Sequence, residues 1–197
     1  DSSSHYGTAF HVGGNLVFTN QHVLSVSRKN TTQCKSFRVQ LNSNQRSRTL
    51  KCKEVHYCDK NTDFCLIEMH PHKKGYALSK QIPVKLKRNP VLSDETRTMS
   101  IGNTRGFGIH AATGFGLESY GNVFKFYAPV FGGNSGGAVF NDHGEVIGVV
   151  RAQSKELYGK DSYNVAISID FIHMLLTKAL EEKPEVFNQI NFIIFRN

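Results

Sequence analysis

Short runs of β-branched and aromatic residues, separated by turns rich in glycine and asparagine, recur along the whole 197-residue chain. These runs occupy residues 7–12, 15–20, 36–41, 49–58, 63–69, 98–103, 111–119, 123–130, 137–142, 145–153 and 163–169. Segments 13–15, 42–48 and 141–144 carry the turn signals between neighbouring runs. Many short strands at regular spacing predict an all-β sandwich or barrel.

One segment follows the helical period instead. Residues 170–183 place Phe171, Met174 and Leu175 on one face, followed by good helix formers, and Pro184 is expected to end the helix. The apolar run 191–195 is expected to be a strand or tail packed on the body. Segment 84–99, which contains a proline and several charges, is interpreted as a linker between two halves of one domain.

The net charge of +8 predicts a soluble protein with a basic surface. No zinc-finger spacing and no aromatic RNA-binding signature accompanies the charge, so nucleic acid is not an expected partner. No run of apolar residues approaches the length of a membrane span, and residues 1–10 do not resemble a signal peptide. A secreted or periplasmic protein would therefore be present here in its mature form.

The four cysteines form an even set, which fits two disulfides in an oxidising compartment. Metal binding is a weaker interpretation because no CxxC pair occurs, and buried free thiols remain open. Of the three possible connectivities we favour the local one, which pairs Cys34 with Cys52 and Cys58 with Cys65.

The strongest chemical signal is Ser135, which stands between two glycine pairs in Gly132-Gly133-Asn134-Ser135-Gly136-Gly137. A serine hydroxyl becomes a nucleophile only when a base is held beside it. Glycines permit tight turning and close approach of a substrate backbone. The backbone of Gly133, Asn134 and Ser135 is the candidate oxyanion hole, in which the amides of Gly133 and Ser135 converge on one spot. A glycine-rich turn without chemistry is the alternative.

The base and its orienting carboxylate must come from other parts of the chain. His22 follows the apolar strand 15–20 closely, so it sits on a rigid platform. Asp63 opens the apolar run 63–69, where a carboxylate can be partly buried and can accept the imidazole N–H. Asp59 is the nearest competitor for that role. Ser135, His22 and Asp63 are therefore the predicted catalytic residues, and their chemistry requires neither a cofactor nor a metal.

The order His22, Asp63, Ser135 is that of chymotrypsin. Blocks 7–24, 59–69, 100–116, 131–150 and 163–170 resemble the bacterial trypsin-like branch of that superfamily, close to HtrA-type proteases and glutamyl endopeptidases. The resemblance implies two perpendicular six-stranded β-barrels with the triad between them. Within a single trypsin-like domain, 1–83 would then be the N-terminal barrel, 84–99 the linker, 100–169 the C-terminal barrel and 170–197 the helix and tail.

Two departures from the family qualify what the resemblance implies. Asn134 stands where pancreatic-type proteases have an aspartate, which argues against activation by insertion of a cut N-terminus. Val150 stands where glutamyl endopeptidases have a histidine, although Arg151 could bring positive charge nearby. The substrate pocket is expected to be lined by Pro129, Val130, Phe131, Gly132, Val150, Arg151, Ala152 and Gln153, with Val165 and Ala166 beyond. No acidic residue occupies the expected base of that pocket, so we predict cleavage after small or medium apolar residues.

The predicted function is a monomeric, secreted or periplasmic serine endopeptidase that acts on proteins or peptides. A viral polyprotein-processing protease of the same fold is one alternative, distinguished by its compartment and by the redox state of its cysteines. A catalytically inactive protease-fold binding protein, using its basic surface to hold an acidic partner, is the other. The intact triad and the glycine-rich loop disfavour the inactive protein.

Overall fold

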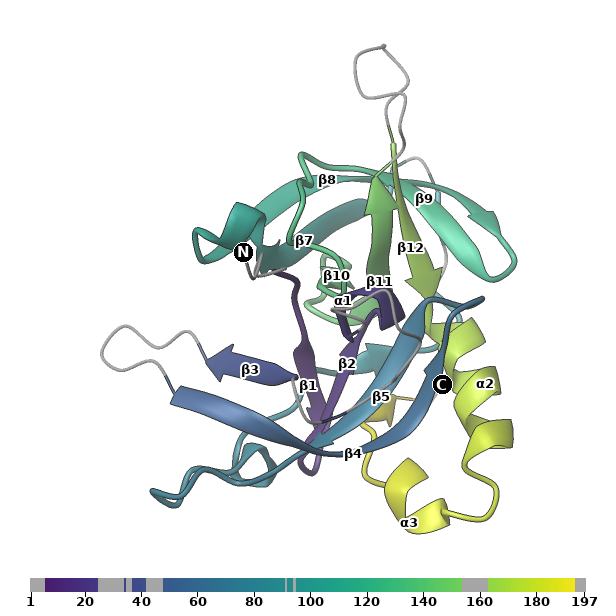
Figure 1. Cartoon of the computed structure of the whole chain (residues 1–197). Coiled ribbons are helices and arrows are strands. Elements are labelled where there is room, and N and C mark those ends of the chain that lie inside the picture. The colour runs from purple at the N-terminus through teal and green to yellow at the C-terminus, as the bar shows by residue number, and fades with distance from the viewer. Residues whose placement is uncertain are drawn as a thin grey trace.

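The computed structural model describes residues 6–24, 34, 37–41, 48–90, 92–93, 95–153 and 163–193. Within these ranges the chain is mostly β-strand, arranged as two sheets with one longer helix on the outside (Figure 1). Most of the sequence-predicted strands are found, because alternation of β-branched and aromatic residues with polar ones suits a half-buried pleated surface. The predicted turn at 42–47 and the end of the predicted strand at 191–195 lie outside the described residues.

The first sheet is antiparallel, with strand order β1-β2-β5-β4-β3. Its strands are β1 (Phe10–Gly13), β2 (Leu16–Thr19), β3 (Arg38–Leu41), β4 (Arg48–Asp59) and β5 (Phe64–Met69). The hairpin between β1 and β2 turns at Gly13 and Gly14, whose φ angles of 138° and 51° are accessible mainly to glycine. Short α1 (Gln21–Leu24) follows β2 directly.

Both predicted disulfides are present in the first sheet. One joins Cys34 to Cys52, and the other joins Cys58 to Cys65. Cys58 and Cys65 face each other across β4 and β5, with Cα atoms 4.1 Å apart. Local pairing follows from this register, because the two cysteines flank the turn that connects neighbouring antiparallel strands.

The second sheet has the order β10-β7-β8-β9-β12-β11-β6-β13, and pairing of β10 with β11 closes six of these strands into a barrel. Its strands are β6 (Leu86–Lys87), β7 (Arg97–Asn103), β8 (Ile109–Tyr120), β9 (Val123–Tyr127), β10 (Ala138–Phe140), β11 (Val146–Gln153), β12 (Asn164–Ser168) and β13 (Phe192–Ile193). Fully buried Phe124, Phe126, Val139 and Ile147 fill it. The first sheet, by contrast, has five strands within the described residues.

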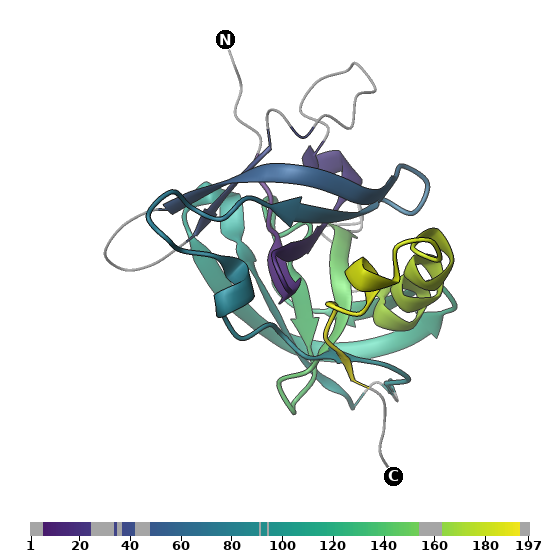
Figure 2. The same cartoon turned by 90° about the horizontal axis from the view of Figure 1, so that it is seen from below.

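The two sheets share one hydrophobic cluster. Phe18 and Phe64 of the first sheet pack in the same cluster as Val149 of the second. Helix α2 (Ile169–Ala179) adds Ile172 and Leu176 to it and lies along the outside of the molecule (Figure 2). Because this apolar contact is continuous, the two sheets form one rigid body, and loops that face each other across it keep fixed positions.

The C-terminal helix ends earlier than its sequence predicts. Helix α2 begins at the Ser168 cap, whose hydroxyl accepts from the amide of Phe171 at 3.1 Å, and it ends at Ala179. Pro184 does not end α2 but occupies the first position of a second short helix, α3 (Pro184–Phe187). The fixed φ of proline suits the first helical position, where no backbone donor is needed.

The predicted linker 84–99 is partly ordered as a strand. Its β6 pairs in parallel with both β11 and β13. The amide of Leu86 donates to the carbonyl of Asn191, and the amide of Asn191 donates to the carbonyl of Val12, at 2.9 and 2.8 Å. The C-terminal segment therefore ties the first hairpin to the linker. No helix in the described part of the chain is long and apolar enough to cross a membrane.

Candidate active site

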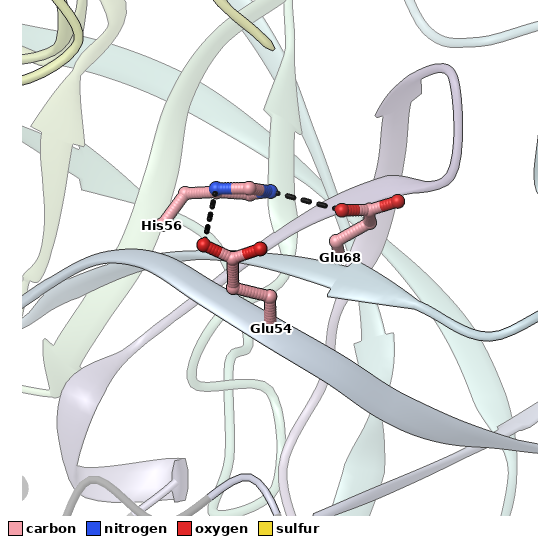
Figure 3. A group of neighbouring side chains, drawn as sticks. All are labelled: Glu54, His56 and Glu68. Atoms are coloured by element: carbon pink, nitrogen blue, oxygen red, sulfur yellow. Dashed lines mark hydrogen bonds and ion pairs between the residues drawn. The ribbon is translucent and has the colours of Figure 1, made fainter. Parts of the chain in front are cut away.

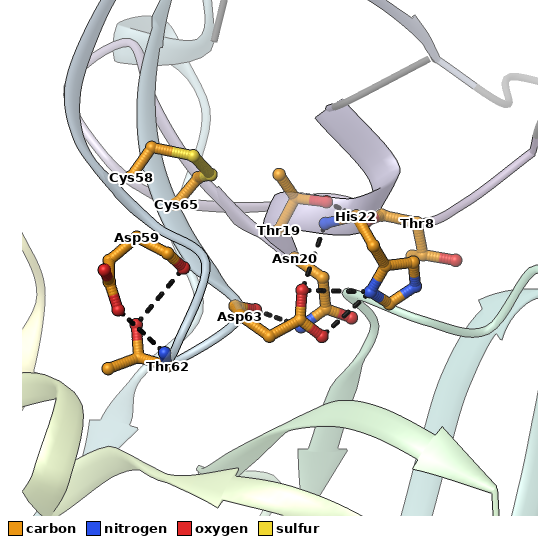
Figure 4. The surroundings of a disulfide bond; sticks show 9 residues. All are labelled: Thr8, Thr19, Asn20, His22, Cys58, Asp59, Thr62, Asp63 and Cys65. Atoms are coloured by element: carbon orange, nitrogen blue, oxygen red, sulfur yellow. Dashed lines mark hydrogen bonds and ion pairs between the residues drawn. A yellow bond between two sulfur atoms is a disulfide. The ribbon is translucent and has the colours of Figure 1, made fainter. Parts of the chain in front are cut away.

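His22 and Asp63, the predicted base and its orienting carboxylate, are hydrogen-bonded to each other (Figure 4). His22 lies in α1, and Asp63 immediately precedes β5. The Nδ1 atom of His22 is 2.8 Å from Oδ2 and 3.0 Å from Oδ1 of Asp63. An ionised carboxylate only accepts hydrogen bonds, so in a neutral imidazole the proton is on Nδ1 and Nε2 is a free acceptor. The His22 side chain is 49% exposed, which leaves its ring accessible.

The backbone around Asp63 holds its carboxylate toward α1. Asp63 has a φ of 55°, in the left-handed region that aspartate tolerates better than most residues. The side-chain amide of fully buried Asn20 donates to the carbonyl oxygen of Asp63 at 2.9 Å. The backbone amide of His22 donates to Oδ1 of Asp63 at 3.0 Å. Asn20 was not among the sequence-predicted site residues, and its only sequence signal is its position two residues before the histidine.

Arg151 of β11 lies beside the same carboxylate. Its Nε atom is 4.0 Å from Oδ2 of Asp63, and its Nη2 atom is 3.4 Å from the carbonyl oxygen of Asn61. The sequence predicted Arg151 as a residue of the substrate pocket, and in the structure its guanidinium also lies beside the carboxylate of Asp63. With the arginine side chain 38% exposed, this long ion pair contributes less than about 1 kcal/mol to stability.

The loop that carries Ser135 is a tight turn anchored to β11. The amide of Asn134 donates to the carbonyl of Phe131 at 3.1 Å, and the amide of Gly136 donates to the carbonyl of Val150 at 2.9 Å. Because both ends of the turn are bonded, the backbone on either side of Ser135 has a defined course. The glycine-rich segment is therefore an ordered loop that is held against strand β11 by hydrogen bonds.

The Ser135 loop also packs against the segment that leads into His22. The amide of Thr8 donates to the carbonyl of Ser135 at 2.8 Å. A Cβ atom placed on Gly136 would lie 3.1 Å from the backbone nitrogen of Asn20 and would also meet the carbonyl oxygen of Thr8, so the backbones are in close contact there. The three regions that carry His22, Asp63 and Ser135 therefore meet at one place, where the two sheets face each other.

The candidate oxyanion hole comprises the backbone of Gly133, Asn134 and Ser135, and the hydrogen bonding of these three amides differs. The amide of Asn134 is used within the loop, whereas no described residue accepts a hydrogen bond from the amide of Gly133 or Ser135. The side chain of Asn134 is buried and accepts from the hydroxyl of Thr104 at 3.0 Å. An uncharged pair thus fills the position that holds an aspartate in pancreatic-type proteases.

This arrangement of residues between two sheets is matched by a known family. The sequence model of the trypsin-like peptidase domain matches residues 7–149, which include His22, Asp63 and Ser135. The chain belongs to the trypsin-like peptidase family. The predicted family is thereby confirmed.

Individual relatives of the peptidase domain are distant. It is 24% identical to exfoliative toxin A of Staphylococcus aureus over 169 residues, which cover 80% of this chain and 60% of the toxin. It is 28% identical to a probable periplasmic serine endoprotease, DegP-like, of Buchnera aphidicola over 120 residues, which cover 56% of this chain and 26% of that protein.

The solved structure of the serine endoprotease from Yersinia pestis is also similar to the peptidase domain. The two superpose with a TM-score of 0.67 at 18% identity, over 89% of this chain and 58% of the other. This likeness confirms the predicted chymotrypsin-like fold. The peptidase domain spans less than two thirds of the length of each of these three relatives.

The predicted pocket residues of the peptidase domain fall on two adjoining segments. In the first, Val130 is buried and Phe131 is 40% exposed, with the guanidinium of Arg105 lying over its ring at 4.9 Å. In the second, the side chain of Val150 is 1% exposed and packs in the core of the second barrel. Pro129 and Gly132 are exposed, and the backbones of Ala152 and Gln153 pair with Val165 and Asn164 of β12.

A second cluster of titratable residues lies away from these loops (Figure 3). The two ring nitrogens of buried His56 face different carboxylates, with Nδ1 3.4 Å from Glu54 and Nε2 3.1 Å from Glu68. Lys183 lies 2.9 Å from Glu54, and Lys53 lies 2.6 Å from Glu68. Each carboxylate thus pairs with a lysine and with one ring nitrogen of His56, and the four contacts form an ion-pair network.

The network lowers the pKa of both carboxyl groups. The hydrogen bond from Lys183, with His56 nearby, holds the pKa of Glu54 below its usual value. Burial opposes ionisation of Glu68, but the hydrogen bonds from Lys53 and His56 outweigh it, and the pKa of Glu68 is also lowered. Because Lys183 precedes α3, the network links β4 and β5 to the C-terminal segment. We interpret it as a structural contact between these elements.

Proposed function

We propose that this peptidase domain is a serine endopeptidase in which Ser135 is the nucleophile, His22 the general base and Asp63 the group that orients His22. The observation that carries the proposal is the hydrogen-bonded pair of His22 Nδ1 and the Asp63 carboxylate beside the Ser135 loop. With the proton on Nδ1, the opposite ring nitrogen can accept the proton of a serine hydroxyl.

The proposed reaction has two halves. As Oγ of Ser135 attacks a peptide carbonyl, its proton passes to Nε2 of His22, and the carbonyl oxygen becomes an oxyanion that accepts from the amides of Gly133 and Ser135. The tetrahedral intermediate collapses when His22 gives its proton to the leaving amine, and an acyl-enzyme forms. Water then loses a proton to His22 and attacks the ester, and the carboxylic acid product leaves with the serine hydroxyl restored.

An extended substrate has an open strand edge to bind. Strand β11 pairs with β10 as far as Val149, and Val150 bonds to Gly136 and Gly137 of the Ser135 loop. Over residues 151–153 the strand pairing found among the described residues is with β12. Residues 151–153 can therefore add backbone hydrogen bonds to a substrate in the extended conformation. We propose proteins or peptides as substrates, with cleavage after small or medium apolar residues.

We also propose an extracellular or periplasmic location. The two disulfides are of the kind that forms and persists in oxidising compartments. A relative described as periplasmic supports the same location.

The test compares the wild-type protein with Ser135→Ala. A fluorophosphonate probe should label the wild-type protein at Ser135, and the variant should lose about four or more orders of magnitude in kcat on a protein or peptide substrate. Cleavage by the purified variant at the wild-type rate would reject Ser135 as the nucleophile. A folded wild-type protein that neither reacts with the probe nor cleaves peptides would favour the inactive binding protein instead.

A further inference from the structure

Thr8 is the residue through which the N-terminal segment, the second barrel and the Ser135 loop are joined. It lies just before β1 and is 7% exposed. Its amide donates to the carbonyl of Ser135 at 2.8 Å, and its carbonyl accepts from the hydroxyl of Thr19 at 2.7 Å. Its hydroxyl accepts from the amide of Asn103 and donates to the carbonyl of Gly133, both at 2.8 Å. Every polar group of Thr8 is therefore bonded.

The direction of these hydroxyl bonds is fixed by chemistry. A threonine hydroxyl carries one proton, and the backbone amide of Asn103 can only donate. The oxygen of Thr8 must accept from Asn103, and its own proton is then committed to the carbonyl of Gly133. A serine at this position can make both bonds, whereas valine, which has the same shape as threonine, can make neither.

The bond to Gly133 constrains a peptide that is otherwise easy to turn. Gly132 and Gly133 are adjacent glycines, and the φ of 93° at Gly133 is accessible mainly to glycine. Rotation of the peptide planes here meets little steric resistance, so hydrogen bonds must hold them. The carbonyl of Gly132 accepts from the amide of Arg105 at 2.7 Å, and the carbonyl of Gly133 accepts from Thr8 at 2.8 Å.

The orientation of these carbonyls determines where the amides point. In a planar trans peptide the C=O and the following N–H point in opposite directions. Arg105 therefore sets the direction of the Gly133 amide, and the amide of Gly137, which donates to the carbonyl of Asn134 at 2.8 Å, sets that of the Ser135 amide. The hydroxyl of Thr8 holds the Gly133–Asn134 peptide plane that lies between these two, and its amide holds the carbonyl of Ser135 on the far side. Among the described residues, the Gly133 and Ser135 amides on either side of this plane have no hydrogen-bond acceptor.

We propose that Thr8 is a positioning residue of the active site, whose hydroxyl holds the Gly133 peptide so that the amides of Gly133 and Ser135 face the oxyanion formed during acyl transfer. This inference rests on the proposed serine endopeptidase function. It assigns to the N-terminal segment a direct influence on the rate of the chemical step.

The test uses Thr8→Val, which removes the hydroxyl, and Thr8→Ser, which retains it. Removal of one oxyanion donor lowers kcat about 100- to 1,000-fold. A donor that is only misaligned should lower kcat by a smaller factor. For Thr8→Val we expect kcat to fall about 10- to 100-fold, with KM changed less than about threefold. Affinity for a peptide aldehyde, which forms a tetrahedral adduct with the serine, should fall in parallel with kcat/KM. Thr8→Ser should retain most of the wild-type kcat.

A matched control separates positioning from stability. Ser168→Ala removes another buried hydroxyl hydrogen bond, at the start of α2, and should lower the melting temperature without changing kcat. If Thr8→Val does not fold, Thr8→Ala removes the same hydroxyl and should show the same loss of kcat. A folded, hydroxyl-free variant with kcat within about threefold of wild type would overturn the inference. Wild-type protein that the fluorophosphonate probe leaves unlabelled would overturn the proposed function as well.

Discussion

Replacing Asp63 with asparagine should remove most of the activity without removing the fold. Oδ1 of Asp63 accepts from the backbone amide of His22 at 3.0 Å, and Oδ2 lies 2.8 Å from Nδ1. Asparagine has only one acceptor oxygen. If that oxygen stays with the backbone amide of His22, the new NH₂ group faces Nδ1 and favours the tautomer that is protonated on Nε2. A histidine in that tautomer cannot take the proton of Ser135.

The loss expected for Asp63→Asn follows from this change of tautomer. In a Ser-His-Asp triad such a change costs about 10⁴ in kcat, which corresponds to about 5 kcal/mol of transition-state stabilisation. The assay is kcat at saturating concentrations of a chromogenic peptide near pH 8, with unfolding followed by circular dichroism to confirm that the variant is folded.

Asp59→Asn is the matched control because it removes the same charge from the same turn. Oδ2 of Asp59 accepts from the amide of Thr62 at 2.7 Å and makes no contact with His22 (Figure 4). We expect kcat of Asp59→Asn to stay within about threefold of wild type. A folded Asp63→Asn variant that keeps more than about a tenth of the wild-type kcat would refute the assignment, as would an equal loss in Asp59→Asn.

Two further predictions concern stability. The Cys34–Cys52 bond spans a sequence separation of 18 and the Cys58–Cys65 bond one of 7, so in the chain-entropy treatment their removal costs about 3 and about 2 kcal/mol. Unfolding in guanidinium should show a larger loss of stability when Cys34 and Cys52 are both replaced by serine than when Cys58 and Cys65 are. A larger loss in the second variant would contradict the prediction. Burial lowers the pKa of His11, so its unfolded form binds a proton more readily and stability should fall as the pH drops below about 6.5. Between pH 7 and pH 5 the free energy of unfolding should fall less steeply in His11→Gln than in the wild-type protein. An equal pH dependence in the two proteins would contradict this prediction.

The strands and the histidine–aspartate pair could be predicted because each has a repeating or ordered signature. Alternation along the chain marks β4, an almost continuous buried apolar run marks β5, and the order of His22, Asp63 and Ser135 marks the family. Strand β6 could not be predicted because its two residues, in a charged segment, become a strand only by pairing with β11 and β13. Local pattern carries no information about such distant partners.

The supporting residues of the site were missed for a related reason. Asn20 and Thr8 make side-chain hydrogen bonds to backbone atoms that are distant in sequence, and a lone asparagine or threonine has no distinguishing pattern. Arg151 was predicted as a pocket residue, and nothing in the sequence indicated that its guanidinium also lies 4.0 Å from Asp63, because that contact joins β11 to the turn before β5. Residue type and spacing predicted the contact between His22 and Asp63, whereas the hydrogen bonds of Asn20 and Thr8 are seen only in the folded chain.

The tie made by the C-terminal segment has a consequence for the order of biosynthesis. Asn191 bonds both to Val12 in the first hairpin and to Leu86 in the linker. A growing polypeptide leaves the ribosome with its N-terminus first, so the histidine, the aspartate and the serine all emerge before this clasp exists. In a nascent chain the packing of Phe18 and Phe64 against Val149 can therefore join the two sheets first, and the clasp is added only when the last described strand, β13, docks on β6.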